Sequence, residues 1–472
     1  MNLLYILLAI LIFGLLIFIH ELGHFLVARW CGVQILEFSI GMGPKIFSKK
    51  SKKSGIMYSL RWLPLGGYVN MLGENGMEAV QGTSDPEGTL ASQNTNEPFV
   101  LEVSEEEQPS NAPQSTPTEI DPELAKKAYC NQSVWKRILI SLAGPVMNLL
   151  LGFILMLVLV LATGKGTAGT TEVGGFFLQY SAENAEAGFQ KSDYLEYIAY
   201  DGDEKFFRVN SREQIYQMIE ASETDVFDVK VWRVAEDGTT SLVLIENVSL
   251  STDFVQNAFM QSLSSAGLQI GDVILKVNKT RVHTLAELSY EITNQGYKPI
   301  TFTVKRNGET VVLENVQLPQ YVDAASNTVF GDMDFKVMPE ESFGFLTVLK
   351  HTWWRSVSTV KMVYDSLVGL FSGRYGVEAV SGPVGITKTI TDVAKTGFLN
   401  LLYLVVVITI NLGVMNLVPF PGLDGGHLLL YLVEIVRRKP VKKEVEGYIN
   451  LIGLALILLL AVLITIKDVI AL

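Results

Sequence analysis

The chain has 472 residues, 49% of them hydrophobic and 18% charged, with a formal net charge of −12. Its mean hydropathy of +0.30 indicates several membrane spans with a soluble part of one or two domains. No basic domain with interleaved aromatic residues is present, which excludes a nucleic-acid-binding protein, and neither of the two cysteines has the spacing of a zinc ribbon.

The first predicted element is a transmembrane helix over residues 1–31. The stretch from Leu3 to Ile19 is an unbroken apolar run, longer than the core of a signal peptide. It lacks a basic start, and no small-residue cleavage site follows it. We therefore expect this helix to be retained in the mature protein.

The end of this apolar run carries the pentad His20-Glu21-Leu22-Gly23-His24. Residues four apart lie on one face of a helix, so His20 and His24 can bind one metal ion. Glu21 is then placed to take a proton from an attacking water. Ionisable groups are costly inside a membrane and usually mark a functional site there. The alternative is a helix end with two interfacial histidines.

Residues 32–75 are predicted to form a membrane-associated β region, because they alternate polar and apolar side chains and contain turn glycines. An exposed edge of this region could bind an extended peptide by strand addition, although a purely structural hairpin fits the residues equally well. Residues 76–125 are rich in Gly, Ser, Pro, Asn, Gln and acids. This composition predicts a disordered acidic cytoplasmic insert.

A second transmembrane helix is predicted over 134–163. Its polar interruptions, Ser141, Gly144-Pro145 and Asn148, should face other helices and not lipid.

The next segment contains an internal repeat. Ala187-Gly-Phe-Gln-Lys-Ser-Asp193 matches Ala266-Gly-Leu-Gln-Ile-Gly-Asp272, and in each copy a helical stretch and an Arg-ended strand follow. This pattern predicts two tandem copies of one small domain, over 172–250 and 255–320. The Ala-Gly-Leu-x-x-Gly-Asp turn resembles that of a PDZ domain. The first copy has Ser192 where glycine is usual, so we expect it to be a degenerate PDZ-like domain. The copies would bind peptides or act as a spacer or steric filter.

Three further helical elements are predicted. Apolar residues at helical spacing over 343–372 indicate an amphipathic helix at the membrane surface. Residues 397–436 contain a third transmembrane helix, from about Phe398 to Val418, which ends in the sequence Asn416 to His427, where Pro419 and Pro421 break the helix. A further short helix is expected from about Gly426 to Val436. The Asp424 carboxylate, followed by glycines, can approach a metal. The fourth transmembrane helix covers 447–470.

The orientation follows from the Lys and Arg clusters near the span ends. Clusters at 49–53, 136–137 and 437–443 fall on one side, which we assign to the cytoplasm. The repeat is then extracytoplasmic, and the pentad and Asp424 both lie towards the cytoplasmic half. We predict a polytopic α-helical membrane protein with about four transmembrane helices, a small membrane-associated β-hairpin and extracytoplasmic tandem PDZ-like α/β domains.

These elements together resemble the site-2 protease family (M50-type intramembrane zinc metalloproteases), and within it the bacterial RseP-type proteases of regulated intramembrane proteolysis. The resemblance rests on the pentad in span one, the Asn416-x-x-Pro419-x-Pro421-x-Leu-Asp424-Gly segment in a later span, and the PDZ-like repeat between them. The segment Phe38 to Pro44 resembles the family's β-hairpin, and Ala143 to Asn148 resembles the start of its second span.

The resemblance implies a Zn²⁺ ion held by His20, His24 and Asp424, with Glu21 as the catalytic base. It also implies that substrate backbone is held by the helix break and the hairpin, whose residues are Asn416, Pro419, Pro421, Gly41 and Gly43. Implied substrates are single-span membrane proteins, shortened first by an upstream site-1-type protease, with anti-sigma factors and signal-peptide remnants among the compatible classes. The protein would be a multi-pass protein of the cell membrane.

Two other readings of the residues are a catalytically inactive membrane scaffold that binds peptide tails through the PDZ-like domains, and a zinc transporter. The complete set of His20, Glu21, His24 and Asp424 argues against the scaffold. A transporter would need polar residues on more spans. We expect no metal role for His283 and His351. We expect His427 to lie at the membrane interface or to support a ligand, without binding the metal itself.

Overall fold

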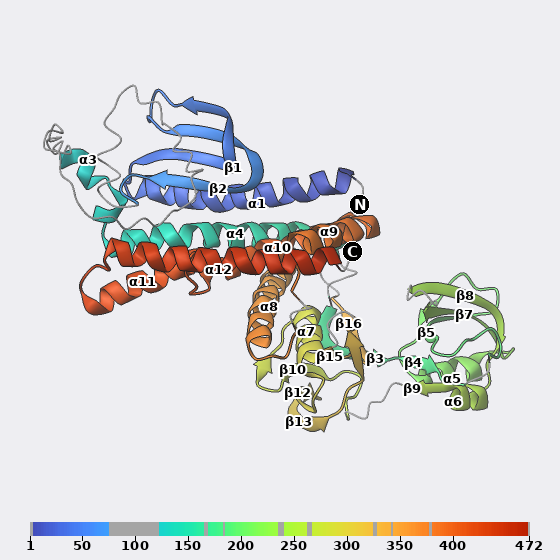
Figure 1. Cartoon of the computed structure of the whole chain (residues 1–472). Coiled ribbons are helices and arrows are strands. Elements are labelled where there is room, and N and C mark those ends of the chain that lie inside the picture. Colours follow the sequence, from blue (N-terminus) through green and yellow to red (C-terminus); the bar gives the residue numbers. More distant parts are fainter. Residues whose placement is uncertain are drawn as a thin grey trace, which may run out of the picture. The chain divides into compact units, whose positions relative to one another are not determined.

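The computed structural model describes residues 3–74, 122–164, 169–182, 185–234, 240–261, 267–323, 328–340, 343–376 and 380–470 (Figure 1). The chain divides into two compact units. One combines Met1–Gly152 with Ser381–Leu472, and the other is Phe153–Val380. The first unit contains both ends of the chain, so residues far apart in sequence meet in it.

Four helices are long and apolar enough to cross a membrane. They are α1 (Leu3–Trp30), α4 (Val134–Thr163), α10 (Phe398–Leu417) and α12 (Lys443–Ile470). The four predicted spans are therefore confirmed as helices of membrane-spanning length. Their apolar side chains are largely exposed, as expected where lipid replaces water as the solvent.

Glycines let these helices approach closely. A Cβ atom on Gly23 of α1 would lie 2.4 Å from the carbonyl oxygen of Ala143 on α4. A Cβ atom on Gly152 of α4 would lie 2.6 Å from the Ile410 side chain on α10. Because small residues allow backbones to pack without a hydrophobic driving force, α4 can contact both α1 and α10.

Two shorter helices complete the first unit. Helix α9 (Pro383–Thr396) packs against α1, α10 and α12, and its first turn donates two backbone N–H bonds of 2.8 Å to Asp468 of α12. No helix was predicted over these residues, so α9 was missed. Helix α11 (Asp424–Arg437) follows the loop after α10 and begins two residues before the expected start.

The β region consists of two long antiparallel strands, β1 (Ile35–Lys50) and β2 (Met57–Met71). The first part of β1 pairs with the end of β2, from Ile35 with Met71 to Ile40 with Gly67, and its last part pairs with the start of β2. Gly41 and Gly43, between these parts, have φ angles of +85° and +86°, which glycine adopts without steric cost. The strands are thus as predicted, and their association with the membrane stays a prediction.

Most of the predicted 76–125 insert lies outside the described residues. Residues 122–125, which the prediction included, belong to the short helix α3 (Pro122–Lys126). A 3-10 turn over Tyr129–Asn131 then leads into α4.

The second unit contains two sheets that each have six strands among the described residues. The first sheet consists of β4 (Leu178–Tyr180), β5 (Tyr194–Tyr200), β6 (Phe207–Arg208), β7 (Val226–Val234), β8 (Thr240–Ser249) and β9 (Phe259–Gln261), with helices α5 (Arg212–Ala221) and α6 (Thr252–Ala258). The first repeat thus extends to β9, past its predicted end at residue 250. The second sheet consists of β3 (Gly169–Phe176), β10 (Val273–Val277), β11 (Thr280–Arg281), β12 (Ile300–Arg306), β13 (Glu309–Val316) and β16 (Phe335–Pro339), with helix α7 (Leu285–Gln295).

The second sheet is not contiguous in sequence. Its strand β3 precedes the whole first repeat, and its edge strand β16 lies beyond the predicted boundary at residue 320. A separate hairpin, β14 (Gln320–Asp323) with β15 (Thr328–Gly331), comes before β16. The first repeat is therefore inserted within the strands of the second sheet.

The repeat seen in the sequence recurs as a repeated set of contacts. Arg233 donates to both carboxylate oxygens of Asp193 at 2.9 and 2.6 Å, and Arg306 donates to those of Asp272 at 2.8 and 2.7 Å. Each arginine also donates to a glycine carbonyl of its own copy. The Arg306 guanidinium holds the pKa of Asp272 below its usual range. Ser192 takes a φ of +73° where the second copy has Gly271 at +89°, so the two copies have the same positive-φ turn at equivalent positions.

Helix α8 (Phe345–Phe371) confirms the predicted helical periodicity of 343–372. Its buried face includes three small polar residues, Thr352, Ser356 and Thr359, and each of these hydroxyls donates to the carbonyl four residues earlier. Apolar residues of the predicted stripe, such as Trp353 and Tyr364, are exposed. This pattern supports an interfacial location, which stays a prediction.

Candidate metal centre

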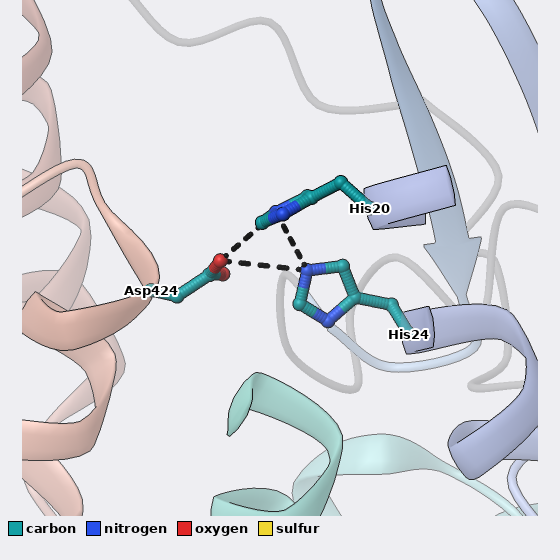
Figure 2. A group of neighbouring side chains, drawn as sticks. All are labelled: His20, His24 and Asp424. Atoms are coloured by element: carbon teal, nitrogen blue, oxygen red, sulfur yellow. Dashed lines mark hydrogen bonds and ion pairs between the residues drawn. The ribbon is translucent and has the colours of Figure 1, made fainter. Parts of the chain in front are cut away.

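The pentad lies within α1, where one helical turn separates His20 from His24. Their Nε2 atoms are 3.2 Å apart, and Figure 2 shows both rings directed towards Asp424. The Asp424 Oδ2 atom is 3.1 Å from Nε2 of His20 and 3.5 Å from Nε2 of His24. Among the described residues, these three side chains are the group whose His, Cys, Asp or Glu donor atoms converge closely enough to hold a metal ion.

Asp424 reaches the histidines because α11 begins at this residue. The next two residues are Gly425 and Gly426, and both are buried. A Cβ atom on Gly425 would lie 2.2 Å from the carbonyl oxygen of Val418, and one on Gly426 would lie 2.4 Å from that of Phe420. Only glycine therefore lets the first turn of α11 pack onto the loop that follows α10.

The donor geometry fits a tetrahedral zinc ion. Bonds of about 2.0–2.1 Å to nitrogen and oxygen place neighbouring ligand atoms of a tetrahedron roughly 3.4 Å apart. The observed separations are 3.1, 3.2 and 3.5 Å. Three protein ligands also leave a fourth position for water or substrate, as in catalytic zinc sites.

The other ring nitrogens of the two histidines face α4. The Nδ1–H group of His24 donates to the carbonyl oxygen of Ile140 at 2.7 Å, which leaves its Nε2 lone pair free. Nδ1 of His20 lies 3.2 Å from the side-chain amide of Asn148, a fully buried residue. The Oδ1 atom of Asn148 has no hydrogen-bond partner in the described part of the chain. Contacts of this kind orient histidine ligands.

Gly144 provides the space beside the histidines. A Cβ atom at this position would lie 2.3 Å from Nε2 of His24 and 2.7 Å from Nε2 of His20. Any larger residue would occupy the side of the site on which both metal-facing nitrogens lie. The close approach of α1 and α4 at Gly23 and Gly144 therefore shapes the space beside the histidines as well as the packing of the two helices.

Glu21 lies beside the β region. A Cβ atom on Gly67 of β2 would be 3.0 Å from Cγ of Glu21 and 2.9 Å from the carbonyl oxygen of Ser39. The carboxylate of the pentad and the last part of β2 thus adjoin the same side of α1.

Comparison with known proteins agrees with this geometry. The model of peptidase family M50 matches residues 8–460. The chain belongs to peptidase family M50.

Curated relatives of this M50 peptidase match along nearly their whole length. A putative zinc metalloprotease of Clostridium acetobutylicum is 27% identical over 465 residues, which cover 98% of this chain and 97% of the relative. The regulator of sigma-W protease RasP of Bacillus subtilis is 26% identical, and the probable protease eep of Enterococcus faecalis is also 26% identical, each over 98% of this chain and 97% of the relative. The M50 peptidase is a zinc metalloprotease that takes part in regulated intramembrane proteolysis.

The substrate-binding residues predicted for the M50 peptidase lie outside the group of three donors. Asn416 is in the last turn of α10, and Pro419 and Pro421 are in the loop before α11. The carbonyl oxygen of Pro421 would be 2.1 Å from a Cβ atom on Gly453 of α12, so this loop packs tightly. Gly41 and Gly43 lie at the bend of β1. Their roles stay predictions.

The remaining histidines have other contacts in the structure. His283 stacks on Trp354 with ring centroids 3.7 Å apart, and His351 pairs with Glu340 at 3.2 Å. His427 contacts Glu446 and Asn450 of α12, each at 3.5 Å.

Sequence reasoning missed the supporting contacts of the metal centre. It expected Asn148 and Gly144-Pro145 to face other helices, which is confirmed for Asn148, but it did not connect them with the histidines. The available signal was the set of polar interruptions in span two, which need partners inside a membrane. The carbonyl oxygen of Ile140 carries no signal in the sequence.

Proposed function

We propose that this chain is an intramembrane endopeptidase that cleaves the transmembrane segments of single-span membrane proteins, with its zinc ion held by His20, His24 and Asp424. The observation that carries the proposal is the convergence of the three donor atoms, within 4.8 Å of one another, on helices that include a span of membrane length. A hydrolytic site there reaches peptide bonds that soluble proteases do not.

Zinc supplies Lewis-acid polarisation of the peptide carbonyl and lowers the pKa of water to roughly 7. Glu21 takes the proton of the attacking water and hands it to the leaving nitrogen. A helical substrate has its backbone hydrogen bonds paired internally, so it must unwind before its peptide bond is accessible. Asn416 and the break at Pro419 and Pro421 hold the unwound backbone, and the strand that bends at Gly41 and Gly43 pairs with it.

The direction of membrane insertion and the partners complete this proposal. The site lies towards the cytoplasmic side, and the repeat domains, PDZ-like in type, lie outside the cytoplasm and select substrates. A site-1-type protease shortens these substrates first. One relative is named as a regulator of sigma-W, which supports a membrane-bound regulator, such as an anti-sigma factor, as the substrate class.

A direct test uses the purified full chain in detergent with a single-span model substrate. Asp424→Asn should lose both bound zinc and cleavage, because the third ligand loses its charge. Asp392→Asn is the matched control, since Asp392 is an exposed carboxylate of α9 that pairs only locally with Lys395 in the described structure. Full zinc content in Asp424→Asn would remove Asp424 from the ligand set, and zinc-loaded protein that leaves single-span substrates intact would contradict the intramembrane activity.

A further inference from the structure

Helix α11 has its polar side inward. Most of its large apolar side chains, such as Leu432 and Val436, are exposed, whereas Tyr431 and Glu434 are buried. Asp424, His427, Tyr431 and Glu434 recur at intervals of three and four residues, so they form one stripe along the helix. Asp424 is the first member of this stripe, and Tyr431 and Glu434 share a partner at its far end, Arg137 of α4.

The far end of this stripe is a buried ion pair. Oε2 of Glu434 lies 2.6 Å from Nη2 of Arg137 in the first turns of α4, and the two residues are 5% and 6% exposed. The other carboxylate oxygen of Glu434 accepts the backbone N–H of Val441 at 3.0 Å. Both oxygens of Glu434 are therefore held by groups outside α11.

Two tyrosines extend the ion pair. The Arg137 guanidinium lies over the ring of Tyr431 at 4.9 Å from its centroid. The hydroxyl group of Tyr431 is 2.7 Å from that of Tyr129, just before α4. Helix α11 is thus joined to the start of α4 by a charge pair, a stacked cation and a hydroxyl pair.

A buried ion pair is a poor way to gain stability, because desolvation offsets its Coulomb attraction. Its directional bonds instead fix how two helices are rotated and how far one is shifted along the other. Glu434 follows Asp424 by ten residues, about 15 Å along one helix at 1.5 Å per residue. Holding Glu434 therefore sets the rotation and depth of Asp424 at the other end.

We propose that Arg137, Glu434, Tyr431 and Tyr129 are positioning residues that hold α11 in the register at which Asp424 meets His20 and His24. This inference rests on the proposed role of Asp424 as a metal ligand. The same α4 helix contacts both histidines through Ile140 and Asn148. It therefore acts as the common reference for all three donors.

The test measures zinc retention by the purified full chain against a competing chelator. Glu434→Gln and Arg137→Gln should each weaken zinc binding about 10- to 100-fold, the range found when groups that orient metal ligands are removed. Arg137→Lys keeps the charge without the planar stack, so its zinc affinity should lie between those of these two variants and that of the wild type. The double variant Arg137→Met with Glu434→Leu should bind zinc no more weakly than either single variant, because no buried charge is left unpaired.

Asp468→Asn is the matched control. Asp468 is also a buried carboxylate of the same unit, and it accepts the Gly382 and Gly385 N–H groups of α9 without touching α11. The zinc affinity of the Asp468→Asn variant should equal that of the wild type. Equal zinc losses in Asp468→Asn and Glu434→Gln would overturn the inference, as would an unchanged affinity in Glu434→Gln.

If Glu434→Gln does not fold, Tyr129→Phe carries the test, since it removes one hydroxyl group and keeps the ring. It should weaken zinc binding several-fold, and an unchanged affinity would reject the positioning role. Asp424→Asn separates the two proposals. If that variant keeps zinc, the ligand assignment fails, whereas zinc loss there together with normal affinity in Glu434→Gln rejects only the positioning role.

Discussion

The side-chain amide of Asn148 on α4 lies 3.2 Å from Nδ1 of His20 on α1, and this contact decides which ring nitrogen of His20 can face a metal. A neutral imidazole has one N–H group and one lone pair. Nε2 can bind zinc only if Nδ1 carries the hydrogen, so Asn148 must offer an acceptor. Its Oδ1 atom has no partner in the described structure, and a 180° rotation of the amide brings this atom opposite Nδ1.

We therefore expect two substitutions of Asn148 to differ in their effect on zinc affinity. Asn148→Leu removes the acceptor and should weaken zinc binding by about 10- to 100-fold, with a similar loss of cleavage. Asn148→Asp keeps an acceptor at the same place and should bind zinc at least as well as Asn148→Leu and close to the wild type. Zinc titration of the purified variants checks this, and equal affinities in the two variants would contradict an acceptor role.

Glu21→Gln should keep zinc but stop cleavage. The amide has the shape of the carboxylate without its basicity, so proton transfer is lost, with a decrease in rate of at least about 100-fold. Zinc analysis and turnover of a single-span substrate are measured on the same preparation. Turnover at the wild-type rate would reject Glu21 as the base.

Gly144→Ala should remove the metal centre by steric conflict. The added methyl group would lie 2.3 Å from Nε2 of His24, well inside van der Waals contact, so the histidines must move. We expect zinc content and cleavage to fall at least tenfold, as for the loss of ligand orientation.

Gly447→Ala is the control for this change. Gly447 lies in α12, and no atom lies within 4 Å of an added Cβ there. It should keep full zinc content and gain slightly in helix stability. Equal zinc content in the two alanine variants would show that the space beside Gly144 is not needed.

The buried carboxyl group of Asp334 should make the stability of the second sheet depend on pH. Burial raises its pKa to about 6 from an ordinary value of 3.8. The folded state binds this proton more tightly than the unfolded state. The contribution of the protonated Asp334 carboxyl group to the stability of the folded state is therefore complete below about pH 4 and is lost as the pH rises through about 6.

Asp334→Asn should therefore raise the free energy of opening of the sheet by about 3 kcal/mol at pH 7.5 and change it little at pH 4. Hydrogen exchange of the β3 and β16 amides measures this opening. Glu309→Gln, at an exposed carboxylate of the same sheet, should show no such dependence. A constant difference between Asp334→Asn and the wild type across this pH range would count against the burial effect.

The sequence predicted the parts of the fold that depend on local pattern. The spans were found because a membrane requires a fixed length of apolar residues, and α4 has the predicted bounds, Val134–Thr163. The histidine pair was found because helical spacing is local. The span orientation placed Asp424 in the same half of the membrane as the pentad, but its role as the third ligand was implied only by the family resemblance, since no spacing rule links residues so far apart in sequence.

The parts that were missed depend on contacts between distant segments. Helix α9 has threonines, lysines and a glycine-rich start, which do not suggest a packed helix, and the carboxylate at its first turn comes from Asp468. Strand β3 joins the sheet of the second repeat through pairings with β10 and β16. Such pairings are set by tertiary packing and leave no periodic trace in the strand itself.

The division of the three donors between α1 and α11 has a consequence for biosynthesis. His24 and Asp424 are 400 residues apart in the sequence, so both histidines are synthesised long before Asp424. A nascent or truncated chain that ends before α11 therefore holds two of the three donors. We therefore expect the zinc site to be completed only once α11 has been made.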